Sequence, residues 1–296
     1  MSETIAVTGA SGHLGGRIVH HLLETCRVPA ARIVATTRDP SRLADLAARG
    51  VDVRQASFDD EAQAAKAFEG VDRLVIVSTD ALDAEGTRLR QHKAAIAAAV
   101  KAGVGHIAYT SMPRPEPGNP VLFAPDHWGS EEAIRATGLP YTLFRNSWYQ
   151  ENLMMGLPQA LAMGQWYTST GEGRTAHVAR DDIAEAIACS LASGSSESAT
   201  WLLTGPEALT NAEVAALASE ITGKPLAVVN LTDEQLAGGM KAAGVPDVLI
   251  PMLVSFDANA RAGGLSDVTG DIEKLTGRKP APLRTFLEAS KAALLG

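Results

Sequence analysis

The stretch from Ile5 to Gly15, IAVTGASGHLG, constrains the fold of this chain more than any other part of its sequence. A short apolar run ends in a turn with three regularly spaced glycines, and apolar residues then recur at helical spacing from His13 to Thr25. Gly9 permits a sharp turn, Gly12 lets a pyrophosphate approach the backbone closely, and Gly15 lets the helix lie against the strand. A strand, a glycine-rich turn and a helix in this order predict a dinucleotide-binding unit.

The helix after this turn also supports the prediction of a dinucleotide site. Its first turn offers unpaired N–H groups and the positive end of the helix dipole to phosphate groups. The spacing is G-x-x-G-x-x-G rather than G-x-G-x-x-G, and an ordinary strand-to-helix turn is the alternative interpretation. We expect the following residues to contact the cofactor: Gly9, Ala10, Ser11, Gly12, His13, Leu14 and Gly15.

Composition excludes several classes of protein. The formal net charge is -8 and no block of Lys and Arg occurs, which argues against a nucleic-acid partner. No apolar run reaches about 18 residues, and the first strand follows Thr4 without room for a signal peptide, so we expect a cytoplasmic protein that does not span a membrane. Cys26 and Cys189 are expected to be buried, inert thiols, and without grouped histidines they predict no metal site. The sequence leaves open whether the protein forms a homo-oligomer.

Strands alternate with helices through the first half of the chain. This alternation predicts βαβ units and therefore an α/β fold with a doubly wound parallel sheet. After the first strand, further strands are predicted at Arg32–Thr37, Val51–Ala56, Arg73–Val77, Gly105–Tyr109 and Pro140–Arg145. Helices are predicted at Pro40–Arg49, Asp60–Phe68, Ala84–Ala102 and His127–Thr137.

The regular alternation weakens after Asn146. A helix is predicted at Gln150–Met163, with strand-like segments at Gln165–Thr168, Thr175–Val178, Thr200–Leu203 and Leu226–Leu231. Asp181 and Asp182 are interpreted as the cap of a further helix rather than a catalytic pair. We predict a nucleotide-binding domain at residues 1–150, completed by parts of 174–205. A smaller, mostly helical lobe at 151–296 is interleaved with the sheet and covers the crevice at the carboxyl ends of its strands.

The end of the second strand indicates which dinucleotide binds. An NAD site has an acidic residue there, whereas this strand ends Thr36-Thr37-Arg38. The planar guanidinium of Arg38 suits a 2′-phosphate, so the sequence favours NADP(H) over NAD. The alternative is a surface arginine before a helix that Asp39 and Pro40 begin.

Four stretches resemble a known family: TGASGHLGG, ATTRDP, HIAYTS at 106–111 and GLPYTLFRNSWYQENL at 138–153. They are similar to the NmrA-like atypical short-chain dehydrogenases, and most of all to type-2 quinone oxidoreductases and triphenylmethane reductases. The resemblance implies a Rossmann-type sheet with a small C-terminal lobe, bound NADPH, and reduction of quinones or large conjugated dyes. It also implies further cofactor contacts at Ser78, Thr79, Asn146, Trp148, Tyr149 and Arg174.

The chain lacks the Tyr-x-x-x-Lys signature of ordinary short-chain dehydrogenases. His127 and Glu131 stand four residues apart where that pair is expected. A histidine titrates near neutrality, so His127 is a candidate proton donor, Glu131 a candidate for orienting it, and Tyr149 a further catalytic candidate. The alternative is a capping or packed histidine followed by a solvated glutamate.

Aromatic residues are concentrated in one part of the sequence. Eight of the 14 aromatic residues lie between positions 123 and 167. An apolar pocket for a flat conjugated ring would need such side chains, although core packing explains each of them singly. The candidates for this pocket are Met112, Trp128, Trp148, Met154 and Trp166.

Two functions fit these observations. The first is an NADPH-dependent oxidoreductase that transfers hydride to a quinone-like or other conjugated aromatic acceptor. The second is an NADP-binding redox sensor that regulates a partner protein without turning the cofactor over. The aromatic-rich stretch favours the enzyme.

Overall fold

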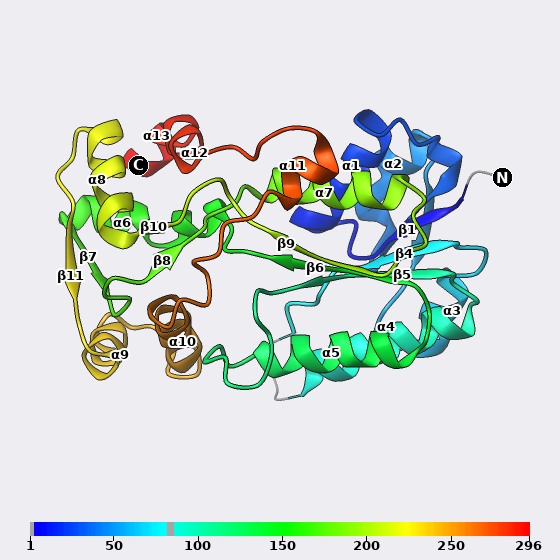
Figure 1. The fold of residues 1–296 in the computed structure, drawn as a ribbon, viewed down its shortest axis with the longest axis horizontal. Coiled ribbons are helices and arrows are strands. Elements are labelled where there is room, and N and C mark those ends of the chain that lie inside the picture. The colour runs from blue at the N-terminus through cyan, green and yellow to red at the C-terminus, as the bar shows by residue number, and fades with distance from the viewer. Residues whose placement is uncertain (1–2, 82–85) are drawn as a thin grey trace.

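A parallel sheet of seven strands forms the centre of the computed structural model, which describes residues 3–81 and 86–296 (Figure 1). The strand order is β3-β2-β1-β4-β5-β6-β9, and each neighbouring pair is parallel. The first six strands have the order of the doubly wound dinucleotide-binding fold. The strands are β1 (Ile5–Val7), β2 (Ile33–Thr37), β3 (Asp52–Gln55), β4 (Arg73–Ile76), β5 (His106–Ser111), β6 (Tyr141–Asn146) and β9 (Ala199–Leu203).

Helices cover both faces of this sheet (Figure 1). Side chains alternate along β1: Ile5 and Val7 pack into one core cluster and Ala6 into the other, as the two-residue period of a strand requires. One face carries α1 (His13–Glu24), α2 (Ala44–Ala48), α7 (Arg180–Ala192) and α11 (Asp271–Thr276). The other face carries α3 (Glu61–Ala67), α4 (Thr87–Lys101) and α5 (Ala124–Ala136).

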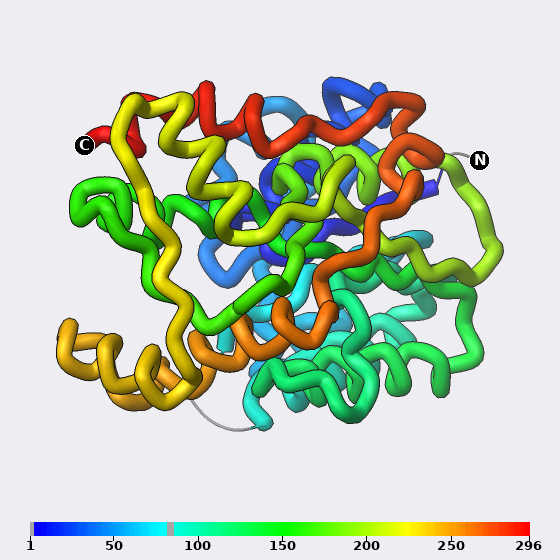
Figure 2. The backbone as a smooth tube through the Cα atoms, turned by 60° about the vertical axis from the view of Figure 1, so that its left-hand side comes forward, coloured from blue at the N-terminus to red at the C-terminus, as the bar shows by residue number. Residues whose placement is uncertain are grey.

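A smaller lobe lies beyond the carboxyl ends of the strands, at the left of Figure 1, and Figure 2 brings this side forward. Two short two-stranded sheets belong to it: β7 (Gln165–Thr168) with β11 (Ala227–Asn230), and β8 (Arg174–Thr175) with β10 (Leu209–Thr210). Its helices are α6 (Leu157–Met163), α8 (Asn211–Thr222), α9 (Asp233–Ala242), α10 (Ile250–Arg261), α12 (Leu283–Ala289) and α13 (Lys291–Leu295). The crevice at the strand ends is therefore covered by the later half of the chain.

The predicted alternation of strands and helices in the first half is confirmed, with boundaries that shift by up to three residues. Helix α5 begins at Ala124 rather than at His127, because Pro125 supplies a favourable first-turn residue. The Asp39 side chain accepts the Ser41 N–H at 3.1 Å and starts the turn at Pro40, as expected. The predicted start of α4 at Ala84 lies outside the described residues.

Two predictions in the second half are wrong. The helix predicted at Gln150–Met163 is two helices, a 3₁₀ helix over Gln150–Met155 and then α6, with Gly156 between them. The strand predicted at Thr175–Val178 is reduced to β8 and an isolated bridge between Val178 and Tyr149. A glycine and a following proline interrupt the first pattern, and short apolar runs do not fix strand pairing.

The interpretation of Asp181 and Asp182 as a helix cap is also wrong. The residue at the N-cap of α7 is Ala179, and both aspartates lie in the first turn. Asp181 accepts a hydrogen bond from Arg17 Nε at 2.6 Å, and Asp182 lies 2.7 Å from Arg278 Nη1. These carboxylates hold neighbouring segments against α7.

Two searches of the described residues bear on membrane and metal binding. No helix in them is long and apolar enough to cross a membrane. Within the same parts of the chain, no group of three or more His, Cys, Asp or Glu side chains is placed to hold a metal ion.

Candidate cofactor and substrate site

The glycine-rich turn joins β1 to α1 at the carboxyl edge of the sheet. Gly9 has a φ of +58°, which favours glycine, and the Gly12 N–H donates to the Gly9 carbonyl at 2.9 Å. The Ala10 N–H donates to Thr36 O at 3.0 Å, and the hydroxyls of Ser11 and Thr37 lie 2.9 Å apart. These bonds fix the turn against the end of β2.

Close packing explains why the last of the three regularly spaced residues of the turn is a glycine. A Cβ atom on Gly15 would lie 2.4 Å from the Gly9 carbonyl oxygen, whereas a Cβ on Gly12 would lie 3.2 Å from the same atom. Gly15 therefore lets α1 approach the turn, and Gly12 is exposed at the position where the backbone would face a ligand.

The N-terminus of α1 is open to an anion, whereas that of α7 is not. No side chain caps α1 at Gly12, and its first turn contains no acidic residue. At α7, by contrast, the Glu151 carboxylate accepts the Arg180 N–H at 3.1 Å. The first turn of α1 therefore presents N–H groups and a positive dipole end to a phosphate, whereas Glu151, Asp181 and Asp182 place negative charge at the first turn of α7.

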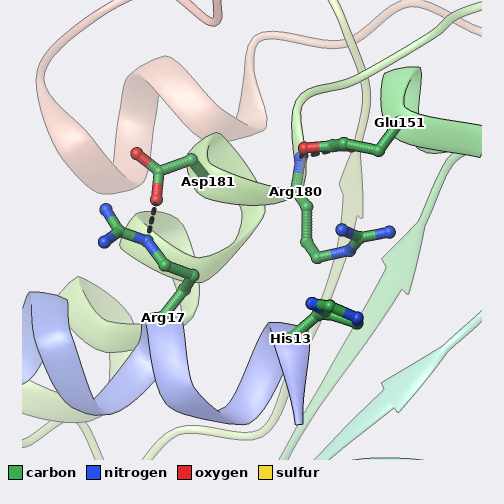
Figure 3. A pocket seen from close by; sticks show the side chains of 5 residues that line it. All are labelled: His13, Arg17, Glu151, Arg180 and Asp181. Atoms are coloured by element: carbon green, nitrogen blue, oxygen red, sulfur yellow. Dashed lines mark hydrogen bonds and ion pairs between the residues drawn. The ribbon is translucent and has the colours of Figure 1, made fainter. Parts of the chain in front are cut away.

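A polar cavity of about 430 Å³ lies where the first turns of α1 and α7 meet. Figure 3 shows the side chains that line it: His13, Arg17, Glu151, Arg180 and Asp181. The Arg180 guanidinium also stands over the Tyr149 ring at 5.0 Å. Arg17 is paired with Asp181 at 2.6 Å, so the Arg180 guanidinium and the open terminus of α1 are the features of this corner that suit a phosphate.

Buried polar atoms without partners gather at the ends of β4 and β6. The hydroxyls of Thr79 and Ser147 and the side-chain carbonyl of Asn146 are buried and accept or donate no hydrogen bond. Leaving such atoms unsatisfied is costly in a native protein. Since all three residues lie at or just after the carboxyl ends of strands, at the edge where the glycine turn lies, their free hydrogen-bonding capacity fits the amide and ribose groups of a nicotinamide nucleotide.

Trp148 links this polar region to an apolar cavity of about 240 Å³ in the smaller lobe. Its indole packs edge-on against Phe256 at 4.8 Å, and Phe256 packs in turn against Phe123 at 5.8 Å. Trp166, Leu153 and further apolar side chains complete the wall. The cavity is therefore lined by aromatic rings, as a site for a flat conjugated molecule requires.

The other residues predicted for this pocket lie elsewhere. Met112 is buried in a small cluster with Val121 and Ala124. Trp128 packs against the Arg135 guanidinium at 5.5 Å, and Met154 packs on the core of the smaller lobe. Of the five predicted pocket residues, Trp148 and Trp166 line the cavity.

His127 is buried in a hydrogen-bond network whose donors define its tautomer. Arg88 Nη2 lies 2.9 Å from His127 Nε2, and a guanidinium can only donate, so Nε2 is the acceptor. The neutral ring then carries its proton on Nδ1 and donates it to the Tyr109 hydroxyl at 2.9 Å. Burial and the Arg88 charge hold the pKa of His127 well below its usual value.

The expectation of a histidine that titrates near neutrality is therefore corrected. Above its lowered pKa, the His127 imidazole is neutral and its single N–H proton already has a partner. It has no imidazolium proton to give to a substrate. Its structural role is to connect α5 with Arg88 on α4 and Tyr109 on β5.

Glu131 does not orient His127. Its fully buried carboxylate accepts hydrogen bonds from the Ser111 hydroxyl at 2.6 Å and from Arg145 Nη2 at 2.7 Å. Arg135, one turn along α5, donates to it at 2.9 Å. This carboxylate joins α5 to β5 and β6 and is not exposed to solvent on the helix surface.

The two predicted arginine contacts have different surroundings. Arg38 is exposed directly after β2, beside Gln55, whose side-chain amide donates to the Arg38 carbonyl at 3.0 Å. Arg174 lies on β8 in the smaller lobe, where its guanidinium bonds Glu213 at 3.0 Å and the Ala208 carbonyl at 2.9 Å. Arg174 is therefore already engaged in the structure of that lobe.

Sequence reasoning missed several buried polar residues of this region. His92 Nε2 accepts a hydrogen bond from the Thr79 N–H at 3.0 Å, and His92 Nδ1 donates one to the Ser130 hydroxyl at 2.9 Å. It thereby holds the loop after β4. Arg88 and His92 stand four residues apart on an alanine-rich helix, and that spacing was the signal for a polar stripe on a buried face. Phe256 gave no such signal.

Comparison with known proteins agrees with this geometry. The NmrA-like family matches residues 1–288 of the chain. The chain belongs to the NmrA-like family. It is 37% identical over 285 residues to quinone oxidoreductase 2 of Escherichia coli, covering 96% of each chain, and 30% identical over 288 residues to an NAD(P)H azoreductase of Xenophilus azovorans, covering 97% of each.

Solved structures of the family superpose over nearly the whole chain. The quinone oxidoreductase of Escherichia coli in complex with NADPH gives a TM-score of 0.91 at 36% identity, over 97% of this chain and 99% of the other. The triphenylmethane reductase of Citrobacter gives 0.89 at 32% identity, over 98% and 99%. With the open phosphate turn described above, these likenesses establish an NAD(P)H-dependent oxidoreductase with NADP(H) as its cofactor.

Proposed function

We propose that this NmrA-like protein uses NADPH to reduce quinone-like or other conjugated aromatic acceptors. The observation that carries the proposal is the position of Trp148. It follows directly after Asn146 and Ser147, whose unpaired polar atoms suit the nicotinamide end of the cofactor, and it forms a wall of the aromatic cavity. A flat ring in that cavity would therefore lie next to the reacting end of the cofactor.

The acid–base chemistry of the site supports a conjugated acceptor over a simple carbonyl. Hydride transfer to a ketone leaves an alkoxide whose conjugate acid has a pKa of about 16, and this demands a placed proton donor. Hydride transfer to a quinone leaves a phenolate-like oxygen with a pKa of about 10. The two pKa values differ by about 8 kcal/mol in the free energy of protonation. Reduction of a quinone therefore needs no strong proton donor, which suits a site without a catalytic Tyr-Lys pair and with a neutral His127.

The chain's own residues would act in three places. The first turn of α1 binds the pyrophosphate, and Arg38 binds the 2′-phosphate. Thr79, Asn146 and Ser147 orient the nicotinamide end, and the cofactor supplies the hydride. The Asn146 amide faces the Tyr149 hydroxyl at 3.4 Å, and an amide N–H donates to that oxygen. Burial raises the pKa of the Tyr149 hydroxyl and its ring lies under the Arg180 guanidinium outside the aromatic cavity, so water would protonate the reduced acceptor.

A set of acceptors tests this proposal. The purified protein is mixed with NADPH and with quinones, azo dyes and simple ketones, and the loss of reduced-nicotinamide absorbance is followed. We expect turnover with the conjugated acceptors and little with the ketones. Binding of NADPH without oxidation by any acceptor would favour the redox sensor instead.

Trp148→Leu and Trp128→Leu form a matched pair for the same assay. Loss of ring stacking in the first variant should raise KM for bulky aromatic acceptors about tenfold. The second removes an indole of the same size that packs on Arg135 outside the cavity, so KM should stay near that of the wild type. Equal effects would place the acceptor elsewhere.

A further inference from the structure

The lining of the aromatic cavity, as far as the structure describes it, includes amide and hydroxyl groups but only one formally charged side chain, the carboxylate of Asp257. Asp257 on α10 and His177 line it together with Trp148, Trp166 and Phe256. None of the described residues that line this cavity is a lysine or an arginine. A cavity with a carboxylate, several aromatic faces and no cation discriminates between ligands by their charge.

Asp257 is held in place on one side only. Its Oδ2 atom accepts the Thr168 hydroxyl and the Ser169 N–H, both at 2.7 Å. Its other oxygen has no hydrogen bond among these contacts. Arg261, which is close by on the same helix, is paired with Asp233 at 2.7 Å. Two donors to one oxygen orient the carboxylate and leave the second oxygen available to a ligand.

His177 adds a second acceptor. Its Nδ1 lies 3.1 Å from the Thr175 carbonyl, which only accepts, so Nδ1 carries the proton and Nε2 presents a lone pair. Burial lowers the pKa of His177 to about 4, so the ring is neutral at physiological pH. Together, His177 and Asp257 offer hydrogen-bond acceptors to whatever occupies the cavity.

We propose that this cavity selects aromatic acceptors that carry a protonated amino group or another strong hydrogen-bond donor, which Asp257 and His177 receive while the aromatic rings pack on its apolar part. This inference rests on the proposed function for the role of the cavity in turnover. The binding preference itself follows from the lining residues and is measurable without any reaction.

Two ligands that cannot be reduced by hydride test it. Calorimetry compares 2-naphthylmethylammonium with 2-naphthoate, which share the ring and differ in charge. The wild type should bind the ammonium compound at least about tenfold more tightly. Asp257→Asn should remove about tenfold of that affinity, whereas Asp247→Asn, which removes an equal charge at the exposed pair with Lys241, should not.

The outcomes separate this inference from the proposed function. Equal binding of the two ligands by the wild type, a measurement that needs no variant, would overturn the inference, as would a preference that Asp257→Asn retains. If the preference is present but no acceptor oxidises NADPH, the proposed function fails while the binding site stands.

A second inference rests on the two cysteines, which were expected to be inert. Cys26 follows the end of α1 and Cys189 lies near the end of α7, and their sulfur atoms are 3.6 Å apart. Both residues are only partly buried. The hydrogen bond from Cys26 lowers the pKa of the Cys189 thiol, which makes Cys189 the better nucleophile of the two.

We infer that Cys26 and Cys189 form an intramolecular disulfide when the protein meets a small disulfide such as oxidised glutathione. The Cys189 thiolate attacks one glutathione sulfur and displaces the other as a thiolate. Cys26 then attacks the mixed disulfide and releases the second glutathione. The protein loses two protons and two electrons, and the oxidant becomes two thiols. The bond would join α1 to α7 at the ends opposite to the polar cavity.

Thiol titration and mass spectrometry test this step. Treated wild type should lose both titratable thiols, remain a single chain on a non-reducing gel, carry no glutathione, and recover both thiols with dithiothreitol. Cys26→Ser should instead retain one glutathione on Cys189. Two free thiols after treatment, a stable glutathione adduct on the wild type, or chains linked to each other would overturn the inference.

Discussion

At the scale of single residues, we expect Arg38 to decide between the two nicotinamide cofactors. It is exposed after β2, and the nearby Asp59 is already held by Arg90 and Gln91. Arg38→Ala should therefore weaken NADPH binding by about 1.5–3 kcal/mol, or about 10- to 100-fold, and leave NADH binding nearly unchanged. Equal losses for both cofactors, measured by fluorescence titration, would contradict the assignment.

His127 should matter little for proton transfer. His127→Gln preserves an acceptor for Arg88 and a donor for Tyr109, so the network can persist. General-acid catalysis is worth about 10²–10⁴ in rate, and we expect the quinone turnover of this variant to stay within about tenfold of the wild type. A thousandfold loss in steady-state assays would show that His127 is an obligatory acid.

The backbone geometry of the glycine-rich turn could be predicted from sequence, and the roles of the buried polar residues could not. Glycine spacing reports backbone requirements that are local. The pKa of His127, by contrast, depends on Arg88, which is distant in sequence and reaches it across the packing of α4 on α5. A motif places a side chain on a helix but does not say which charge faces it.

At the scale of elements, the packing of α1 on the first turn depends on Gly15. A Cβ atom there would meet backbone atoms of Gly9 at 2.4 Å, so Gly15→Ala should lower the free energy of unfolding by about 2–4 kcal/mol. Gly239→Ala is the matched control, because it lies inside α9 with no atom near its missing Cβ, and it should be neutral or slightly stabilising. Similar urea-unfolding curves for both variants would contradict the packing argument.

Elements of the first half were predictable because each strand and helix carries its own periodic pattern. Beyond Asn146 the patterns are short, and tertiary pairing decides the outcome. The break at Gly156 has a local cause in the glycine and the proline that follows it. The bridge between Tyr149 and Val178 depends on how the smaller lobe meets the sheet and does not follow from local propensity.

At the scale of the whole molecule, four buried histidines with lowered pKa values should make stability depend on pH: His92, His106, His127 and His177. Burial lowers the pKa of His92 to about 3 and that of His177 to about 4, from an ordinary value of 6.5. Below about pH 6.5 the unfolded chain binds protons that the folded protein excludes, so the free energy of unfolding falls as the pH falls towards 4. Each histidine contributes up to about 1.4 kcal/mol per pH unit.

Urea unfolding between pH 7 and pH 4.5 measures this effect. His92→Gln should reduce the slope of unfolding free energy against pH by about one proton relative to the wild type. A wild-type free energy that stays constant over this range would show that these rings are protonated in the folded protein.

The arrangement of the two lobes brings α10 from the smaller lobe against Trp148, just after β6, and so forms a wall of the aromatic cavity. Sequence alone placed Trp148 and Trp166 in a pocket but gave no sign of Phe256 or Asp257, which arrive through long-range packing. We propose that a ring in this cavity receives hydride from bound NADPH.

Anaerobic stopped-flow measurement with NADPH deuterated at the transferred position tests that claim most directly. The protein is mixed with one equivalent of cofactor and an excess of a quinone. We predict that reduced-nicotinamide absorbance decays with formation of the quinol, and that the decay is slower with the deuterated cofactor. Tight binding of NADPH with no decay for any conjugated acceptor would contradict the account.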